Sequence, residues 1–130
     1  MNEVLESIKK NEGFKGVVYK DTLGFDTIGY GTKLPLTQEE AQLILVSRMG
    51  AKASELKSVQ PVFETLPVNK QGIIIEMCYQ MGVNGVMNFK NMWFALQKKD
   101  YATASKEMLN SKWAKQTPNR ANQLALLMAS

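Results

Sequence analysis

The chain has 130 residues, of which 45% are hydrophobic and 22% are charged, a balance typical of a single globular domain. One cysteine and no histidine exclude an internal disulfide, histidine-based catalysis and most zinc or haem sites. The net charge of +4 is uneven, because residues 1–65 carry 8 basic and 9 acidic side chains and residues 66–130 carry 8 and 3. The second half, at +5, favours an anionic polymer as partner: a nucleic acid, a membrane surface or a cell-wall glycan.

The first 31 residues predict a helix followed by a small β-hairpin. Apolar residues at helical spacing indicate a helix over residues 2–12. The segments 16–20 and 25–31 are typical of strands, and Asp21-Thr22-Leu23-Gly24 between them has the residue preferences of a type I turn.

The rest of the chain is predicted to be helical. Thr37 and Glu40 form a capping box that opens a helix over residues 38–57, and a buried helix runs from Pro67 to Gly82. Three further helices are expected to begin at the N-caps Asn88, Asp100 and Thr117, the last with Pro118 at its first position. The predicted fold is therefore α+β and mainly helical, with a small α/β lobe (about 13–57) and a helical lobe (about 1–12 and 58–130).

Two carboxylates border the hairpin and suggest glycosidase chemistry. Glu12 ends the first helix, where the negative end of the helix dipole favours a protonated acid, while Asp21 in an open turn stays ionised. Thr27 offers a hydroxyl to hold a water. Taken singly, each residue is better explained without catalysis: Glu12 as a solvated helix-end charge, Asp21 as a turn residue and Thr27 as a strand former.

The order of several motifs is more specific than any one of these residues. The N-terminal set resembles the catalytic segment of the T-even bacteriophage-type lysozymes: Glu12-Gly13, Tyr19-Lys20-Asp21-Thr22 and Thr27-Ile28-Gly29-x-Gly31. Two later segments resemble the same family in the same order: Tyr79-Gln80-Met81-Gly82 and Ser111-Lys112-Trp113-x-x-Gln116-Thr117-Pro118-Asn119-Arg120. The resemblance covers residues 1–31 and about 58–123.

The resemblance implies a lysozyme-like fold of two lobes and assigns roles to six residues. Glu12 would protonate the glycosidic oxygen, and Asp21 with Thr27 would position the attacking water. These lysozymes invert configuration, which calls for carboxyl groups roughly 6.5–9.5 Å apart. Arg120 would orient the catalytic glutamate, and Gln80 and Trp113 would bind sugars on the far wall of the cleft.

The chain also departs from the family pattern. Many members have a histidine where this chain has Thr32, the stretch between Gly31 and Pro61 is short, and the sequence ends soon after Leu127. These differences concern the hinge and the grip on substrate, whereas the catalytic set is complete.

The resemblance thus implies a peptidoglycan hydrolase that cleaves the β-1,4 bond between N-acetylmuramic acid and N-acetylglucosamine and lyses bacteria. No cofactor, metal or nucleic acid is implied, and a monomer is expected. No secretory signal is visible and the longest apolar run, near residues 73–75, is too short to span a bilayer. We therefore expect a phage or prophage endolysin made in the host cytoplasm, without stable membrane insertion and released to the wall by a holin.

Three alternatives stay open. A lytic transglycosylase needs an acid such as Glu12 but no water-holding pair. A non-catalytic wall-binding protein on the same scaffold would bind glycan without turnover. A basic nucleic-acid-binding domain is the third, although the positive charges are scattered and form no recognition helix.

Overall fold

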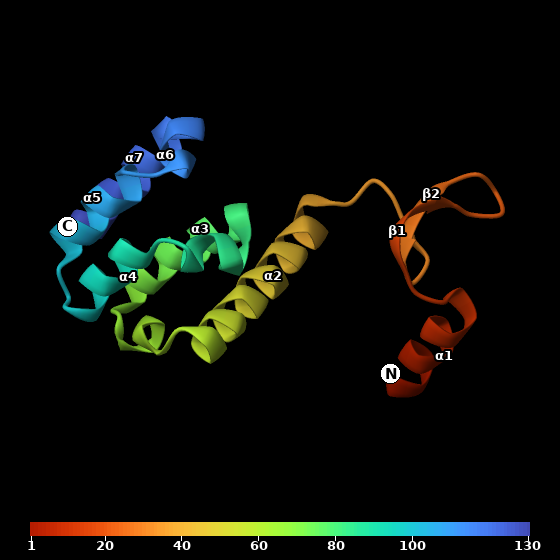
Figure 1. The fold of residues 1–130 in the computed structure, drawn as a ribbon. Helices are drawn as coiled ribbons and strands as arrows, with labels where there is room; N and C mark the ends of the chain where they lie inside the picture. The colour runs from red at the N-terminus through yellow and green to blue at the C-terminus, as the bar shows by residue number, and fades with distance from the viewer. The chain divides into compact units, whose positions relative to one another are not determined.

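The chain forms two compact units of unequal size. The computed structural model describes residues Met1–Ser130, which divide into a small unit, Met1–Ile44, and a helical unit, Leu45–Ser130 (Figure 1). Seven α-helices and one three-stranded antiparallel sheet confirm the predicted α+β, mainly helical fold class. The predicted lobe boundaries, with residues 1–12 grouped with 58–130, stay a prediction.

The small unit consists of one helix and the predicted hairpin, which a short third strand extends. Its elements are α1 (Asn2–Glu12), β1 (Lys15–Lys20), β2 (Asp26–Gly29) and β3 (Thr32–Lys33). The strands pair antiparallel in the order β1-β2-β3, with Thr27 opposite Tyr19 on one side and opposite Lys33 on the other. Because directly paired residues project from the same face of a sheet, Tyr19, Thr27 and Lys33 share one face.

Helix α2 (Gln38–Val59) begins in the small unit and continues into the helical unit. The predicted capping box is present: Glu40 N donates to Thr37 Oγ1 at 3.1 Å, and Thr37 N donates to Glu40 Oε1 at 2.9 Å. These two bonds satisfy amide groups that would otherwise lack partners at the helix start. The helix runs two residues beyond its predicted end.

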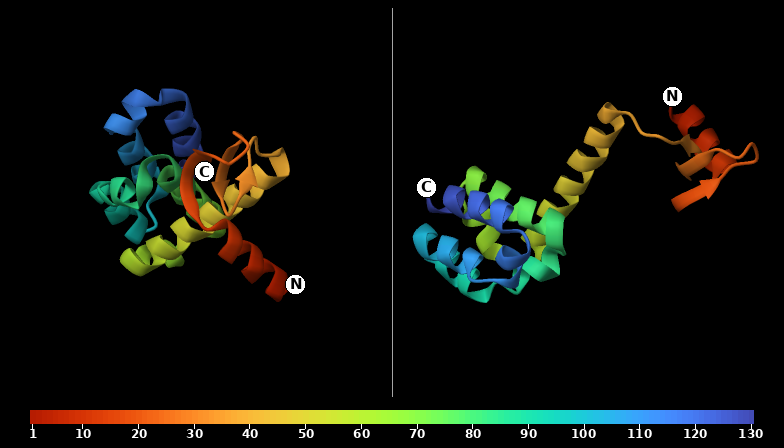
Figure 2. Two further views of the ribbon diagram at one scale, coloured as in Figure 1. Left: turned by 90° about the vertical axis from the view of Figure 1, so that its right-hand side faces the viewer. Right: turned by 90° about the horizontal axis from the view of Figure 1, so that it is seen from above.

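The helical unit contains nearly all of the buried side chains. Helix α5 packs against α4 and α7, and α3 and α6 also contact α7 (Figure 2). Its elements after α2 are the 3-10 helix η1 (Pro61–Thr65), α3 (Val68–Met87), α4 (Lys90–Gln97), α5 (Tyr101–Leu109), α6 (Lys112–Gln116) and α7 (Pro118–Ala129). Cys78 is buried in this core, and burial raises the pKa of its thiol to about 11. None of the helices is both long enough and apolar enough to cross a membrane.

Two predicted helix boundaries in this unit are confirmed. Gly82 has φ 81° and ψ 159°, which breaks the helical path where the sequence predicts an end, and helical residues resume immediately after it. Asp100 caps α5, because its Oδ1 accepts a hydrogen bond from Thr103 N at 3.1 Å.

The predicted caps of α4 and α7 differ in detail. Asn88 is not the N-cap of α4; it has the helical φ and ψ of −73° and −10° and ends α3, and Phe89 is the cap residue instead. Thr117 lies at the N-cap position of α7, with Pro118 first in the helix, but its hydroxyl donates to Trp113 O at 3.0 Å. That hydroxyl therefore closes α6 rather than opening α7.

A buried lysine fastens the end of α7. Lys70 in α3 is only 3% exposed, and its Nζ donates to Leu127 O at 2.8 Å and to Ser130 O at 3.0 Å. The ammonium also lies 5.0 Å from the centre of the Tyr101 ring. A cation at a helix C-terminus offsets the partial negative charge of the last carbonyl groups.

We predict that Lys70→Met lowers the free energy of unfolding by about 1–3 kcal/mol, because two charge-assisted hydrogen bonds to carbonyl groups are lost. Urea unfolding followed by circular dichroism measures the change. Lys57→Met, at an exposed position of α2, serves as the control and should change stability by less than about 0.5 kcal/mol. Equal stabilities of the two variants would contradict the capping role.

Candidate active site

Glu12 is the last residue of α1 and is held close to the loop between β2 and β3. Gly13 ends the helix with φ 70°, and its N–H donates to Lys9 O at 2.9 Å. The Glu12 side chain is exposed and lies directly over Gly31, whose φ is 73°. A Cβ at Gly31 would stand 2.5 Å from Glu12 Oε2 and 2.6 Å from Cδ, so only glycine allows the carboxyl group to stay in this position.

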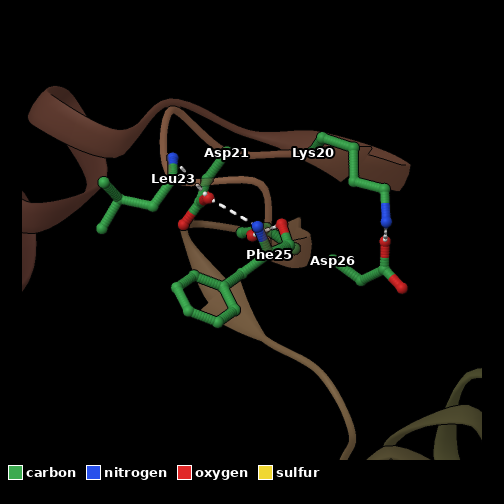
Figure 3. Close-up of polar contacts among 6 residues, drawn as sticks. Lys20, Asp21, Leu23, Phe25 and Asp26 are labelled. Atoms are coloured by element: carbon green, nitrogen blue, oxygen red, sulfur yellow. Dashed lines mark hydrogen bonds and ion pairs between the residues drawn. The ribbon is translucent and has the colours of Figure 1, made fainter.

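Asp21 closes the turn between β1 and β2 with its own carboxylate. Its Oδ1 accepts hydrogen bonds from Leu23 N at 2.9 Å and Phe25 N at 2.8 Å, as Figure 3 shows. Backbone bonds complete the turn, since Asp21 N donates to Phe25 O and Gly24 N donates to Asp21 O. The side chain is 13% exposed, so most of its surface is covered.

Lys33 holds the other oxygen of Asp21. Its Nζ lies 2.6 Å from Asp21 Oδ2. This hydrogen bond, followed by the one from Phe25 N, holds the pKa of the Asp21 carboxyl below its ordinary value. In turn the pKa of Lys33 is raised, mainly by the bond to Asp21 and further by the charges of Asp21, Glu12 and Tyr19. The pair is therefore ionised at neutral pH, and Glu12 lies within the electrostatic range of the same ammonium.

Thr27 lies at the centre of the sheet with no exposed surface. Its hydroxyl donates to Phe25 O at 2.9 Å, which leaves the oxygen lone pairs as acceptors. Through its pairing with Lys33, Thr27 lies next to the Asp21–Lys33 pair. The small unit thus gathers Glu12, Asp21 and Thr27 around Lys33.

The other three predicted site residues lie in the helical unit. Gln80 and Trp113 contact each other, because Trp113 Nε1 donates to Gln80 Oε1 at 2.9 Å. Both line a hollow of about 340 Å³, together with Met81, Phe89, Ser111, Lys112 and Gln116. Arg120 forms an ion pair with Glu76 (Nε to Oε2, 2.8 Å), a partner that the sequence did not suggest. Its predicted contact with Glu12 stays a prediction.

Sequence reasoning missed two residues of this site. Lys33 was not singled out as a partner of Asp21, and Glu76 was not singled out as a partner of Arg120. Neither pair has a local signal: 44 positions separate the second pair, and the first depends on the register of β2 with β3.

The two carboxyl groups of the small unit indicate the class of protein. The unit presents a carboxyl group at a helix end, Glu12, and an ionised carboxylate in a strand turn, Asp21, and only the second is paired with the ammonium of Lys33. Two carboxyl groups of this kind are what glycoside hydrolysis needs, one to give a proton and one to stay charged.

Comparison with known proteins supports this class. The family model for phage lysozymes matches residues 9–128, so the chain belongs to the phage lysozyme family, and it is a lysozyme-type peptidoglycan hydrolase. It is 34% identical to the probable T4-type lysozyme 1 of Dictyostelium discoideum, over 95% of this chain and 92% of that protein. It is 28% identical to the pre-baseplate central spike protein Gp5 of Enterobacteria phage T4, over 95% of this chain but 27% of that protein.

We predict that Gly31→Ala displaces the Glu12 carboxyl group and lowers kcat/KM on peptidoglycan by roughly tenfold to a hundredfold, since small misplacements of a reacting group have effects of this size. The added methyl meets the far end of a side chain that can swing away, so the fold survives with the acid displaced.

Gly29→Ala is the matched control for this prediction. Gly29 has the same left-handed backbone, with φ 70°, but a Cβ there meets no atom within 4 Å. Both variants should lose about 1–2 kcal/mol of stability from backbone strain, and only Gly31→Ala should lose most of the activity. Equal activity losses in the two variants would show that strain, not the position of Glu12, is responsible.

Proposed function

We propose that this enzyme hydrolyses the β-1,4 bond between N-acetylmuramic acid and N-acetylglucosamine with inversion of configuration. The observation that carries the proposal is the placement of both carboxyl groups in the small unit, with Asp21 bound to Lys33 at 2.6 Å in the turn and Glu12 lying over Gly31 in the next loop. An acid and an ionised carboxylate on one structural unit supply the two groups that glycoside hydrolysis needs, and inversion is the outcome that membership of the phage lysozyme family leads us to propose.

In the proposed reaction, Glu12 gives its proton to the glycosidic oxygen as the bond from that oxygen to the anomeric carbon breaks. Asp21 stabilises the positive charge that develops on the sugar, and a water attacks from the opposite face and passes its proton to Asp21. Thr27 accepts a hydrogen bond from that water. Because Thr27 has no exposed surface, a neighbouring side chain on the same sheet face must move for the water to reach it.

Sugars on either side of the cleaved bond bind to the helical unit in this proposal. Gln80 and Trp113 lie at the wall of one hollow. Trp113 is 6% exposed and its Nε1 holds Gln80 Oε1, so the exposed amide nitrogen of Gln80 is the group that donates to a sugar hydroxyl. Arg120 orients Glu12 through guanidinium donors that Glu76 does not use. The proposed biological role is lysis of the bacterial cell by a monomeric endolysin made in the cytoplasm and released by a holin.

A lytic transglycosylase is the second candidate, and it cleaves the same bond without water. The ionised, hydrogen-bonded Asp21 next to Thr27 favours hydrolysis, since a transglycosylase has no use for a group that holds the attacking water. Products separate the two reactions: hydrolysis leaves new reducing ends, first in the α configuration if inversion occurs, and transglycosylation leaves anhydro-sugar ends.

We predict that Glu12→Gln abolishes turnover of purified Gram-negative peptidoglycan and that Asp21→Asn lowers it at least a hundredfold, an effect within the range for loss of a catalytic acid or base. Both changes keep the side-chain shape. In the Asp21→Asn variant the amide oxygen still accepts from Leu23 N and Phe25 N, so the turn is retained. Turbidity clearing measures turnover, with product analysis by mass spectrometry and anomeric NMR.

Circular dichroism spectra like that of the wild type are the control for both variants. Near-normal clearing by both would overturn the assignment of the two carboxyl groups. Tight binding of peptidoglycan without turnover by the wild type would instead support the non-catalytic wall-binding alternative.

A further inference from the structure

The hydrogen bonds around Asp21 leave one acceptor position of its carboxylate free. A carboxylate has about four lone-pair sites, two on each oxygen. Leu23 N and Phe25 N occupy both sites of Oδ1, and Lys33 Nζ occupies one site of Oδ2. The remaining site is on Oδ2, beside the ammonium of Lys33.

The sheet register places Lys33 at this point. Lys33 lies in β3 opposite Thr27, and Thr27 in β2 lies opposite Tyr19, so the three side chains share a face. The titratable groups that act on Lys33 come from three elements: Asp21 in the turn, Glu12 at the end of α1 and Tyr19 in β1. Lys33 is therefore the cation that binds Asp21 and that also lies within the electrostatic range of Glu12.

A second lysine–aspartate pair in the same hairpin is an ordinary exposed ion pair and serves as a comparison for Lys33 and Asp21. Lys20 Nζ lies 2.7 Å from Asp26 Oδ1 (Figure 3), but the Asp26 side chain is 53% exposed and forms no other side-chain hydrogen bond. Exposed pairs of this kind contribute little to stability and fix no geometry. Asp21, at 13% exposed and with both oxygens occupied, is fixed in orientation.

We propose that Lys33 is a positioning residue of the reaction, which holds the Asp21 carboxylate so that the free lone pair of Oδ2 faces the attacking water. This proposal rests on the proposed function of Asp21. Without the ammonium, Oδ1 keeps its two backbone partners, but Oδ2 loses its partner in the chain and can bind bulk water at both of its lone-pair sites. The attacking water is then no longer directed to one lone pair. Lys33 also acts on the charge of Asp21, because loss of its hydrogen bond lets the pKa of Asp21 rise toward the ordinary value.

The test compares Lys33→Met, Lys33→Gln, Lys33→Arg and Lys20→Met, with kcat and KM on solubilised peptidoglycan chains measured from pH 3 to pH 8. Lys33→Met should lower kcat about tenfold or more with KM within about twofold, since the water and not the sugar is misplaced. The acidic limb of the kcat–pH profile of Lys33→Met should move to higher pH, because the ionised form of Asp21 is the active one and the pKa of Asp21 rises. Lys33→Arg should restore most of kcat, and Lys20→Met should match the wild type.

Two results would overturn the proposal. The first is a Lys33→Met enzyme with wild-type kcat and an acidic limb of the pH profile at the wild-type position. A loss of kcat in Lys33→Met that Lys20→Met reproduces would count equally against it. The second is failure of both Lys33→Met and Lys33→Gln to fold when Lys33→Arg folds, which would make the role of Lys33 purely structural. Lys33→Gln is included because it removes the charge but keeps a polar side chain with a hydrogen-bond donor at this position.

Asp21→Asn in the same assay separates failure of this proposal from failure of the proposed function. An active Asp21→Asn enzyme would contradict the function assigned to Asp21. An inactive Asp21→Asn enzyme beside a fully active Lys33→Met enzyme would contradict only the positioning role of Lys33.

Discussion

The arrangement of the small unit depends on one side chain, the carboxylate of Asp21. Its Oδ1 accepts the two backbone N–H groups that close the turn, and this closure sets the pairing of Lys20 with Asp26 and of Tyr19 with Thr27. The position of Thr27 then sets that of Lys33, which returns to bind Oδ2 of the same carboxylate. In the loop between β2 and β3, Gly31 has no side chain, so the loop backbone can lie close to the Glu12 carboxyl group. The turn role and the proposed catalytic role of Asp21 are therefore compatible, because each uses a different oxygen.

The small unit depends on polar contacts rather than on a packed apolar core. Within Met1–Ile44 only Thr27 is fully buried, whereas the apolar core lies in Leu45–Ser130. The geometry of the small unit rests on hydrogen bonds and ion pairs, which are sensitive to pH and salt, rather than on a packed core. Because the pKa of Asp21 is lowered, its stabilising bonds persist at neutral pH and are lost as the pH falls through the folded-state value. Acid therefore weakens the contacts that hold Asp21, as it also weakens the cap of α5, where the bonds from Thr103 lower the pKa of Asp100.

Local sequence patterns predicted the parts of the structure that local hydrogen bonds determine. Asp21 and Gly24 indicated the turn, Thr37 and Glu40 the start of α2, and Gly82 the break in α3. The prediction was wrong at Asn88, where the preference of asparagine for caps yields to the helical backbone that ends α3. The partners of Asp21 and Arg120 lie 12 and 44 positions away, and strand register or helix packing decides them. Such pairs leave no periodic trace, so the sequence located one member of each pair, Asp21 and Arg120, but not the partner that holds it.

The ion pair between Arg120 and Glu76 follows the same principle as that between Lys33 and Asp21. A guanidinium has five N–H donors, and Glu76 uses only the one on Nε. Both side chains remain partly exposed, at 38% and 42%, so the terminal nitrogens stay available to a second acceptor. Glu76 therefore orients Arg120 without saturating it, just as Lys33 leaves one lone pair of Asp21 unused. In each pair the first contact fixes a charged group in place, and the remaining hydrogen-bonding capacity is what can act on a second carboxylate, a sugar hydroxyl or a water.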